Sequence, residues 1–281
     1  MKVLVTGAGG QLGRALVERL GDRLVAAPRR EELDVTDAGA ARAVVSRSRP
    51  GVVINAAAYN KVDAAESEPQ EALAVNAVGV LHLARAAAEV GALFVHVSTD
   101  YVFDGQASRP YVEDDPPRPL NVYGVSKRAG EMMVAASGAR AILIRTSGVF
   151  GPGGSRGKGG SFVDRILERA RAGRALRVVA DQVFSPTYAP DLADALLTLV
   201  ERGAEGVVHV ANDGACTWHE LAAAALELAG VTATVERIAS ADLGAAARRP
   251  PYSVLSTARY RALSGRPLRP WREALAEMLA R

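Results

Sequence analysis

Cysteine is nearly absent from this sequence, since Cys216 is the only one among 281 residues. A single thiol cannot close a disulfide within the chain, which favours a reducing compartment, and we expect a cytoplasmic protein. The four histidines are scattered and show no metal-ligand spacing with Cys216, so no metal site is predicted. No uncharged apolar run is long enough to span a bilayer, and the short apolar start at Met1 is typical of a first strand rather than a signal peptide.

Blocks of charge of one sign are lacking as well. The 34 basic and 31 acidic side chains are interspersed and leave a net charge of +3. This pattern argues against a nucleic-acid-binding arm, and we expect neither nucleic acid nor membrane as a partner. A few arginines would still suffice for a local cleft that attracts an acidic small molecule.

Short β-branched runs alternate with stretches of helical period through the first half of the chain. Strands are expected at residues 2–5, 23–27, 52–56, 93–97 and 141–146, and helices at 12–20, 37–47, 68–90 and 123–136. Repeated strand–helix–strand units of this length predict an α/β protein with a Rossmann-type, doubly wound parallel sheet. We therefore predict a dinucleotide-binding domain over residues 1–147.

The second half of the chain, residues 148–281, is predicted to form mainly a smaller, C-terminal substrate-binding lobe, with some elements returning to the main sheet. Helices are expected at 162–172, 190–202, 219–228 and 271–279, and strands at 176–179 and 206–210. The glycine-rich residues 151–160 are expected to form a mobile loop, either a plain connector or a flap over the site. Trp218 and Trp271 are expected to pack in the core.

A glycine-rich turn follows the first predicted strand and opens the first helix. Gly7, Gly10 and Gly13 have the spacing of a dinucleotide-binding loop, in which the glycines permit a tight turn, close approach to a pyrophosphate and close packing of helix on strand. The helix N-terminus then presents free N–H groups to the phosphates. After the second strand, Arg29 and Arg30 precede any acidic residue. This order favours NADPH over NADH if the arginines meet a 2′-phosphate, although they are equally explained as solvated side chains.

Tyr123 and Lys127 are four residues apart on a predicted helix and so lie on one face. A lysine ammonium beside the phenol is expected to lower the phenol's pKa and to suit Tyr123 for donating a proton to a developing alkoxide. Ser98 and Thr99 end a predicted strand, where ligand crevices form in doubly wound sheets, and either hydroxyl could polarise a substrate carbonyl. Another buried strand ends at Asn55, and the small residues after it would let a cofactor pass close to the backbone.

Longer stretches of the sequence resemble the extended short-chain dehydrogenase/reductase superfamily and, within it, the dTDP-4-dehydrorhamnose reductase family. The resemblance covers most of the chain and is densest before residue 150. Its motifs include Gly10-Gln11-Leu12-Gly13, Asp34-Val35-Thr36-Asp37, Asn55-Ala56-Ala57-Ala58-Tyr59, Val75-Asn76-Ala77, Ser98-Thr99-Asp100-Tyr101-Val102-Phe103-Asp104-Gly105, Asn121-Val122-Tyr123-Gly124, Arg145-Thr146-Ser147 and Asp181-Gln182.

This resemblance implies reduction of the C4 keto group of dTDP-4-dehydro-6-deoxy-L-mannose to dTDP-L-rhamnose, with NADPH or NADH as the cofactor and a nucleotide sugar as the substrate. It implies that Tyr123 is the proton donor, Lys127 its partner and Thr99 the third catalytic residue. Thr99, Asp100 and Tyr123 are the implied substrate contacts. Together with the glycine loop and Arg29, the cofactor contacts are Gly7, Gly10, Gln11, Leu12, Gly13, Asp34, Val35, Ala57, Ala58, Tyr59, Tyr123 and Lys127.

The sequence departs from the family pattern at two positions. Gly148 follows Arg145-Thr146-Ser147, where the family usually has a tryptophan that packs on the substrate, and this leaves the identity of the sugar open. Pro190 stands nearest to the position where some members bind magnesium through a glutamate at a dimer interface, so no metal is expected. A monomer and a homodimer both remain compatible with the sequence.

Three other functions are compatible with the same scaffold. A reductase of another nucleotide-linked sugar is the nearest, and an epimerase or dehydratase that returns the hydride to bound NAD is the second. A non-catalytic NADP-binding protein, like the regulatory subunit of methionine adenosyltransferase, is the third. The presence of Thr99, Tyr123 and Lys127 together favours an enzyme over a binding subunit.

Overall fold

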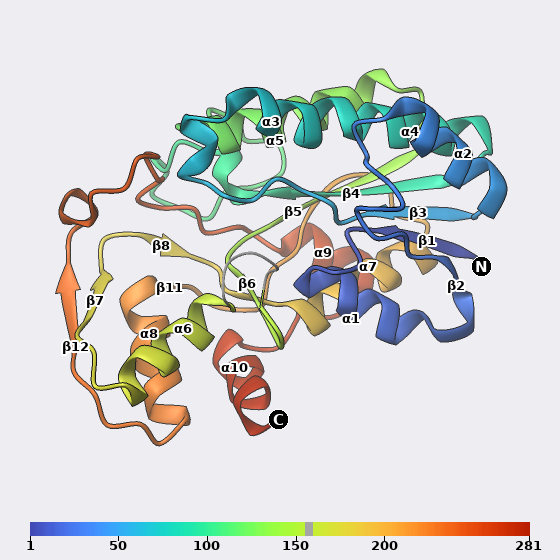
Figure 1. The fold of residues 1–281 in the computed structure, drawn as a ribbon. Coiled ribbons are helices and arrows are strands. Elements are labelled where there is room, and N and C mark those ends of the chain that lie inside the picture. Colours follow the sequence, from blue (N-terminus) through green and yellow to red (C-terminus); the bar gives the residue numbers. More distant parts are fainter. Residues whose placement is uncertain (155–159) are drawn as a thin grey trace.

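Six parallel strands form the central sheet of the computed structural model, which describes residues 1–154 and 160–281. Their order is β10-β5-β4-β3-β1-β2, so the chain starts inside the sheet and winds outward in both directions (Figure 1). The strands are β1 (Val3–Thr6), β2 (Leu24–Ala26), β3 (Val52–Asn55), β4 (Leu93–Thr99), β5 (Ala141–Thr146) and β10 (Gly206–His209). This order confirms the predicted Rossmann-type, doubly wound sheet.

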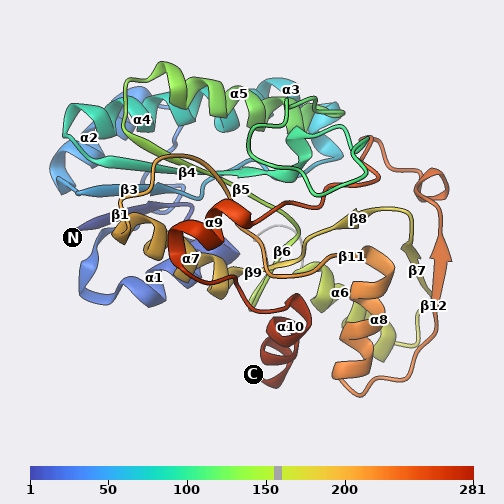
Figure 2. The same cartoon turned by 180° about the vertical axis from the view of Figure 1, so that it is seen from behind.

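Helices cover both faces of the sheet, as Figures 1 and 2 show. One face carries α2 (Ala38–Ser48), α3 (Pro69–Leu73), α4 (Gly79–Glu89) and α5 (Val122–Ala136), and the other carries α1 (Gln11–Leu20), α7 (Ala189–Glu201) and α9 (Ala258–Ser264). The central strands are therefore buried on both sides, and Val5, Ile54 and Ile144 are fully inaccessible to solvent. Such burial explains why these strands are almost continuous apolar runs in the sequence.

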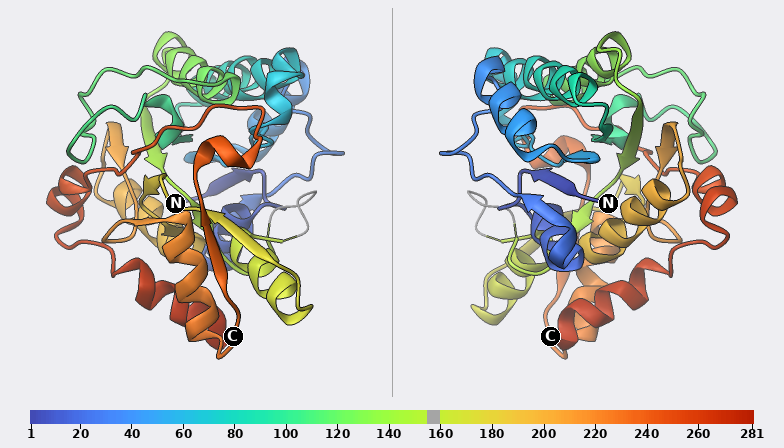
Figure 3. Two further views of the ribbon diagram at one scale, coloured as in Figure 1. Left: turned by 90° about the vertical axis from the view of Figure 1, so that its left-hand side faces the viewer. Right: turned by 90° about the vertical axis from the view of Figure 1, so that its right-hand side faces the viewer.

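A smaller lobe with its own apolar core lies beyond the carboxyl edge of the sheet. The left panel of Figure 3 views the molecule from the side of this lobe. It pairs β7 (Leu176–Val179) with β12 (Val235–Ile238), and β8 (Val183–Phe184) with β11 (Cys216–Thr217). Its helices are α6 (Phe162–Arg171), α8 (Trp218–Leu228) and α10 (Trp271–Ala280). A further pair, β6 (Val149–Phe150) and β9 (Thr187–Tyr188), lies where the chain leaves and re-enters the main sheet region.

The second half of the chain also contributes to the main sheet. Strand β10 pairs with β5, and α7 packs against α1. The proposed domain boundary at residues 147 and 148 stays a prediction, because segments from both sides of it share one apolar core.

The long helix expected at residues 68–90 is interrupted in the structure. Pro69 occupies the first turn of α3, but residues 74–78 form a π-helical turn between α3 and α4. Asn76 in this turn accepts a hydrogen bond from the Tyr59 backbone N–H and donates one to the Tyr59 carbonyl, each 2.9 Å long. The turn therefore holds in place the loop that follows β3.

Most predicted elements are confirmed with end shifts of one or two residues, and α8 starts with a capping box between Thr217 and Glu220. The sequence analysis missed β6, β8, β9, β11, β12 and α9, all of them short. The predicted loop at 151–160 is described only at its two ends. Its middle, residues 155–159, lies outside the described residues, so neither the connector nor the flap is tested.

Candidate active site

A cleft of about 560 Å³ opens at the carboxyl edge of the sheet, between the sheet and the smaller lobe. Segments that follow β1, β3, β4 and β5 form one wall, and Gln182, Phe184 and Trp218 of the lobe contribute to the other. Every residue predicted for the site lines this cleft: Gly7, Gly10, Gln11, Leu12, Gly13, Arg29, Asp34, Val35, Ala57, Ala58, Tyr59, Thr99, Asp100, Tyr123 and Lys127. The tertiary structure thus brings together residues up to 120 positions apart in sequence, from Gly7 to Lys127.

The glycine loop is packed too tightly for any side chain at two of its positions. Gly7 has a φ of +69°, and a Cβ there would lie 2.5 Å from the backbone nitrogen of Ala57. At Gly13 a Cβ would lie 2.2 Å from the Gly7 carbonyl oxygen. Gly10 caps α1 without any side-chain hydrogen bond, and the first turn of α1 contains no acidic residue. The N–H groups and the positive end of the α1 dipole therefore face the cleft without a competing carboxylate, which suits a pyrophosphate.

The adenosine end of the cleft is exposed and carries charges of both signs. One carboxylate oxygen of Asp34, Oδ1, accepts hydrogen bonds from both the backbone N–H and the hydroxyl of Thr36, which ties the side chain to its own turn. These hydrogen bonds lower the pKa of Asp34. Arg29 lies 3.4 Å from Glu32, and Arg30 lies 3.8 Å from Glu71. Both arginines pair loosely and remain available to a phosphate.

Tyr123 and Lys127 lie on the first turns of α5, whose N-cap residue is Asn121. The Asn121 side chain accepts a hydrogen bond from the Gly124 N–H and donates one to the Arg248 carbonyl, so the helix start is fixed to the C-terminal part of the chain. The Lys127 ammonium donates a 2.6 Å hydrogen bond to the carbonyl of Val97 in β4. Burial lowers the pKa of Lys127 to about 8, and the carboxylate of Glu131 opposes this shift.

The predicted lowering of the Tyr123 pKa is wrong for the protein alone. Burial raises the pKa of Tyr123 to about 12, the nearby charge of Asp100 adds to the rise, and a hydrogen bond with Thr99 only partly offsets it. Lys127 does not overcome this effect, because its ammonium is directed to the Val97 carbonyl. Tyr123 is consequently a neutral phenol at neutral pH, which is the form that can donate a proton.

The structure distinguishes the two hydroxyls at the end of β4. Ser98 also borders the cleft, but it is buried and its hydroxyl is used in a 2.7 Å hydrogen bond to Glu131. Thr99 interacts with the phenol of Tyr123 and donates to the Asp100 carboxylate at 2.9 Å. Thr99 is therefore the hydroxyl placed to act with Tyr123.

Asp100 is buried in a cage of hydroxyl groups. Besides Thr99, its carboxylate accepts hydrogen bonds from Ser147 at 2.7 Å and from Ser253 at 2.6 Å. Burial raises the pKa of Asp100 although all three hydroxyls favour its charged form. The cage joins the ends of β4 and β5 to the C-terminal segment and so fixes the floor of the cleft.

Comparison with known proteins identifies the family. The whole chain, residues 1–281, matches the family model described as the RmlD substrate binding domain. The chain belongs to this family. A dTDP-4-dehydrorhamnose reductase of Streptomyces griseus is 43% identical over 283 residues, which cover 98% of this chain and 91% of that protein.

One further relative and one solved structure are similar to this chain over nearly their whole length. A probable dTDP-4,6-dihydroxy-2-methyloxan-3-one 4-ketoreductase of Streptomyces antibioticus is 41% identical over 284 residues, which cover 99% of this chain and 94% of that protein. The crystal structure of dTDP-4-dehydrorhamnose reductase from Bacillus anthracis in complex with NADP has a TM-score of 0.94 and 36% identity, covering 100% of this chain and 99% of that one.

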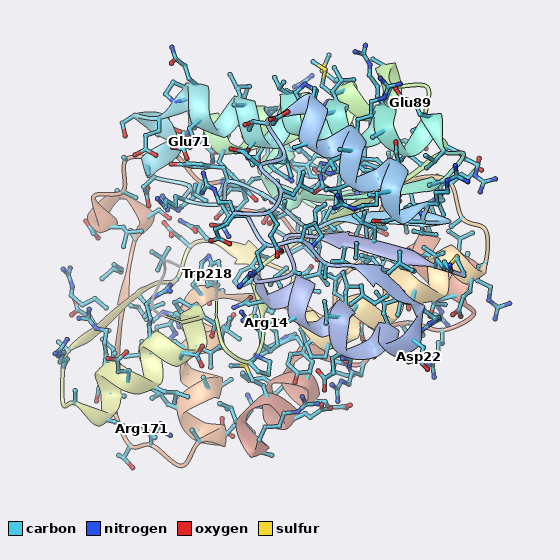
Figure 4. The ribbon with its side chains drawn as sticks, turned by 45° about the vertical axis from the view of Figure 1, so that its right-hand side comes forward. Arg14, Asp22, Glu71, Glu89, Arg171 and Trp218 are labelled. Atoms are coloured by element: carbon cyan, nitrogen blue, oxygen red, sulfur yellow. The ribbon has the colours of Figure 1, made fainter. Side chains whose placement is uncertain are left out.

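Some residues of this RmlD-family cleft were missed in the sequence. Ser147 and Gln182 stand in quoted motifs but were given no role, and Phe184 and Ser253 had no local signal. Trp218 packs on the lobe's core, as expected, and it also lines the cleft, half-buried at the start of α8. Figure 4 shows Trp218 where the smaller lobe meets the sheet. Trp271 packs on the lobe's core, as expected.

In residues 1–154 and 160–281, no group of three or more His, Cys, Asp and Glu side chains is arranged to hold a metal ion. Over the same part of this RmlD-family chain, no helix has the length and apolar character needed to cross a membrane.

Proposed function

We propose that this protein reduces the C4 keto group of dTDP-4-dehydro-6-deoxy-L-mannose (dTDP-4-dehydrorhamnose) to form dTDP-L-rhamnose, with NAD(P)H as the reductant. The observation that carries the proposal is one continuous cleft that is lined both by the glycine loop and by Thr99, Tyr123 and Lys127. The reductase names of the full-length relatives support the same chemistry.

The residues around the glycine loop fit a dinucleotide. The close packing at Gly7 and Gly13 keeps the loop against the sheet, and the uncapped start of α1 would receive the pyrophosphate. Asp34 and Val35 would border the adenosine, and Ala57 to Tyr59 would lie beside the middle of the cofactor. When bound, NAD(P)H supplies the hydride that reduces the ketone.

Tyr123 would supply the proton that completes the reduction. As the carbonyl carbon gains hydride, the carbonyl oxygen becomes an alkoxide, and the neutral phenol of Tyr123 transfers its proton to that oxygen. The product is a secondary alcohol, and the phenolate regains a proton from solvent. The Lys127 ammonium stabilises the transient phenolate, and Thr99 orients the phenol and the substrate oxygen.

We infer a preference for NADPH over NADH. Arg29 and Arg30 have only loose carboxylate partners and can move to a 2′-phosphate, whereas the Asp34 carboxylate is engaged by Thr36. Replacing Arg29 with alanine should raise the KM for NADPH several-fold and leave the KM for NADH unchanged. Equal effects on both cofactors would exclude a 2′-phosphate contact.

The decisive experiment measures the loss of nicotinamide absorbance with dTDP-4-keto-6-deoxyglucose, its 3,5-epimerase and the purified protein. We expect NADPH oxidation that requires all three and yields dTDP-L-rhamnose. Stoichiometric oxidation also separates a reductase from an epimerase or dehydratase, which would return the hydride. Binding of NADPH without turnover would favour the regulatory-subunit alternative. Light scattering on the same sample tests the expectation of a monomer or homodimer, and the cytoplasmic location stays a prediction.

A second candidate is reduction of a different nucleotide-linked 4-ketosugar. The observation that favours it is Gly148, which stands where the family usually has a substrate-packing tryptophan. The relative from Streptomyces antibioticus also carries a different 4-ketosugar in its name. Faster turnover of another dTDP-4-ketosugar than of the rhamnose precursor would decide for this candidate.

A further inference from the structure

The ring of Phe184 lies so close to Gly148 that it leaves no space for a side chain at position 148. Gly148 has a φ of +51°, and a Cβ there would lie 2.2 Å from Cε2 and 2.5 Å from Cδ2 of the Phe184 ring. No adjustment of a few tenths of an ångström relieves such an overlap. The ring of Phe184 therefore covers the face of Gly148 and fills the space that a side chain at this position would take.

Phe184 is one half of a stacked aromatic pair. Its ring centroid lies 4.0 Å from that of Trp218, with an angle of 24° between the planes. The antiparallel pairing of β8 with β11 sets this contact, because Phe184 is paired with Cys216, two residues before Trp218. Phe162 packs edge-on against the Trp218 ring at 4.8 Å and holds it from another side.

The aromatic pair lies at the reacting end of the cleft. Both rings belong to the cleft lining, as does Gly148. Gly148 directly follows Ser147, whose hydroxyl donates to Asp100, and Asp100 is bonded to Thr99. The rings thus stand near the residues proposed to handle the keto group.

We propose that the stacked rings of Phe184 and Trp218 form the surface on which the hexose ring of the nucleotide sugar lies, and that Gly148 lacks a side chain to make room for Phe184. This assignment rests on the proposed reductase function. A 6-deoxyhexose has an apolar C–H face and a methyl group, which pack favourably on aromatic rings, while its hydroxyl and keto groups need polar partners. The hydroxyl cage around Asp100 offers such partners beside the rings.

The two tryptophans of the chain give a direct test, because only Trp218 lines the cleft. In the Trp271→Phe variant, Trp218 is the sole tryptophan. With NADP⁺ present, adding dTDP-L-rhamnose should change its fluorescence, and adding dTDP alone should not. The matched Trp218→Phe variant retains Trp271 and should show no change with either ligand. An equal response of Trp218 to dTDP would place the base, not the hexose, on the rings.

Affinity measurements complete the test. Trp218→Ala should weaken dTDP-L-rhamnose binding by about tenfold, while Trp218→Phe restores most of it. The affinities for dTDP and NADP⁺ should stay unchanged in both variants, which also shows that the fold is intact. Gly148→Ala should likewise weaken dTDP-L-rhamnose binding, because the added methyl displaces Phe184.

The possible failures are distinguishable. If the wild-type protein binds dTDP-L-rhamnose and Trp218→Ala binds it equally well, the aromatic surface is overturned and the reductase function survives. If the wild-type protein binds NADP⁺ but no dTDP-L-rhamnose, the proposed substrate is wrong, and this assignment is overturned with it.

Discussion

Glu131 and Arg145 form a buried, bidentate ion pair beneath the reacting end of the cleft. Two arginine nitrogens donate to the two carboxylate oxygens at 2.9 Å each, and the side chains are only 1% and 2% exposed. The same carboxylate accepts from Ser98 at 2.7 Å. Glu131 lies one helical turn after Lys127. Through Ser98 and Arg145 it connects α5 to β4 and β5.

The first prediction concerns the stability contributed by this pair. Glu131→Gln leaves the buried Arg145 without its counter-charge, so we expect the free energy of unfolding to fall by about 3–5 kcal/mol. Urea denaturation measures this change. As a control, Arg42→Ala removes the exposed ion pair with Glu89 and should cost no more than about 1 kcal/mol. Similar losses in the two variants would show that the buried pair is not a main support of the fold.

The second prediction concerns the proton donor. Tyr123→Phe removes only the phenolic hydroxyl, so kcat should fall by about 10²–10⁴-fold while the Kd for NADP⁺ stays close to that of the wild type. Steady-state turnover and NADP⁺ titration measure the two quantities. The control is Tyr252→Phe, which removes a hydroxyl outside the residues that line the cleft. An unchanged kcat in Tyr123→Phe would remove this residue from the mechanism.

The third prediction concerns the pH dependence. The pKa of Lys127 is lowered from 10.5 to about 8, so its ammonium loses the proton as the pH rises through about 8. In the proposed mechanism the ammonium stabilises the Tyr123 phenolate, so kcat/KM should fall above about pH 8. Tyr123 itself does not set this limb, since its pKa is raised to about 12.

Two variants at position 127 assign this limb. Lys127→Arg keeps the charge at all accessible pH values and should move the decline to higher pH, whereas Lys127→Met should lower kcat/KM throughout and flatten the profile. A decline near pH 8 that persists in Lys127→Met would assign it to another group.

The fourth prediction concerns the glycine loop. Gly7→Ala combines a positive φ with a Cβ that lies 2.5 Å from backbone atoms, so it should distort the loop and abolish measurable NADP⁺ binding. Gly91 has a nearly identical φ of +70° but open space around it. Gly91→Ala should therefore cost only about 1–2 kcal/mol of stability and leave NADP⁺ binding unchanged. If both variants bind NADP⁺ equally well, close packing at Gly7 is not required for the cofactor.

Local sequence patterns were sufficient for the sheet, the glycine loop and the placement of Tyr123 and Lys127 on successive turns of one helix. The strands of a doubly wound sheet are buried on both faces and so appear as short apolar runs. The glycine spacing reflects a single turn, and the Tyr–Lys spacing reflects one helical turn. In each case the determining contacts lie within a few residues along the chain.

Other features depend on contacts between distant segments. The choice of Thr99 over Ser98 was decided by Glu131, which attracts the Ser98 hydroxyl from a neighbouring helix. The raised pKa of Tyr123 was decided by burial, which no spacing of residues shows.

What the sequence by itself determined is the fold class, the family and the catalytic and cofactor-side residues of the cleft, but not the residues that the smaller lobe and the C-terminal segment add to it. Only the tertiary structure decided which surface would face the sugar. Trp218 has the sequence context of a core residue, and its place on the cleft follows from the β8–β11 pairing and the stack with Phe184. Phe184 in turn occupies the space beside Gly148, 36 positions away in sequence, and such packing between remote positions exists only once the chain is folded.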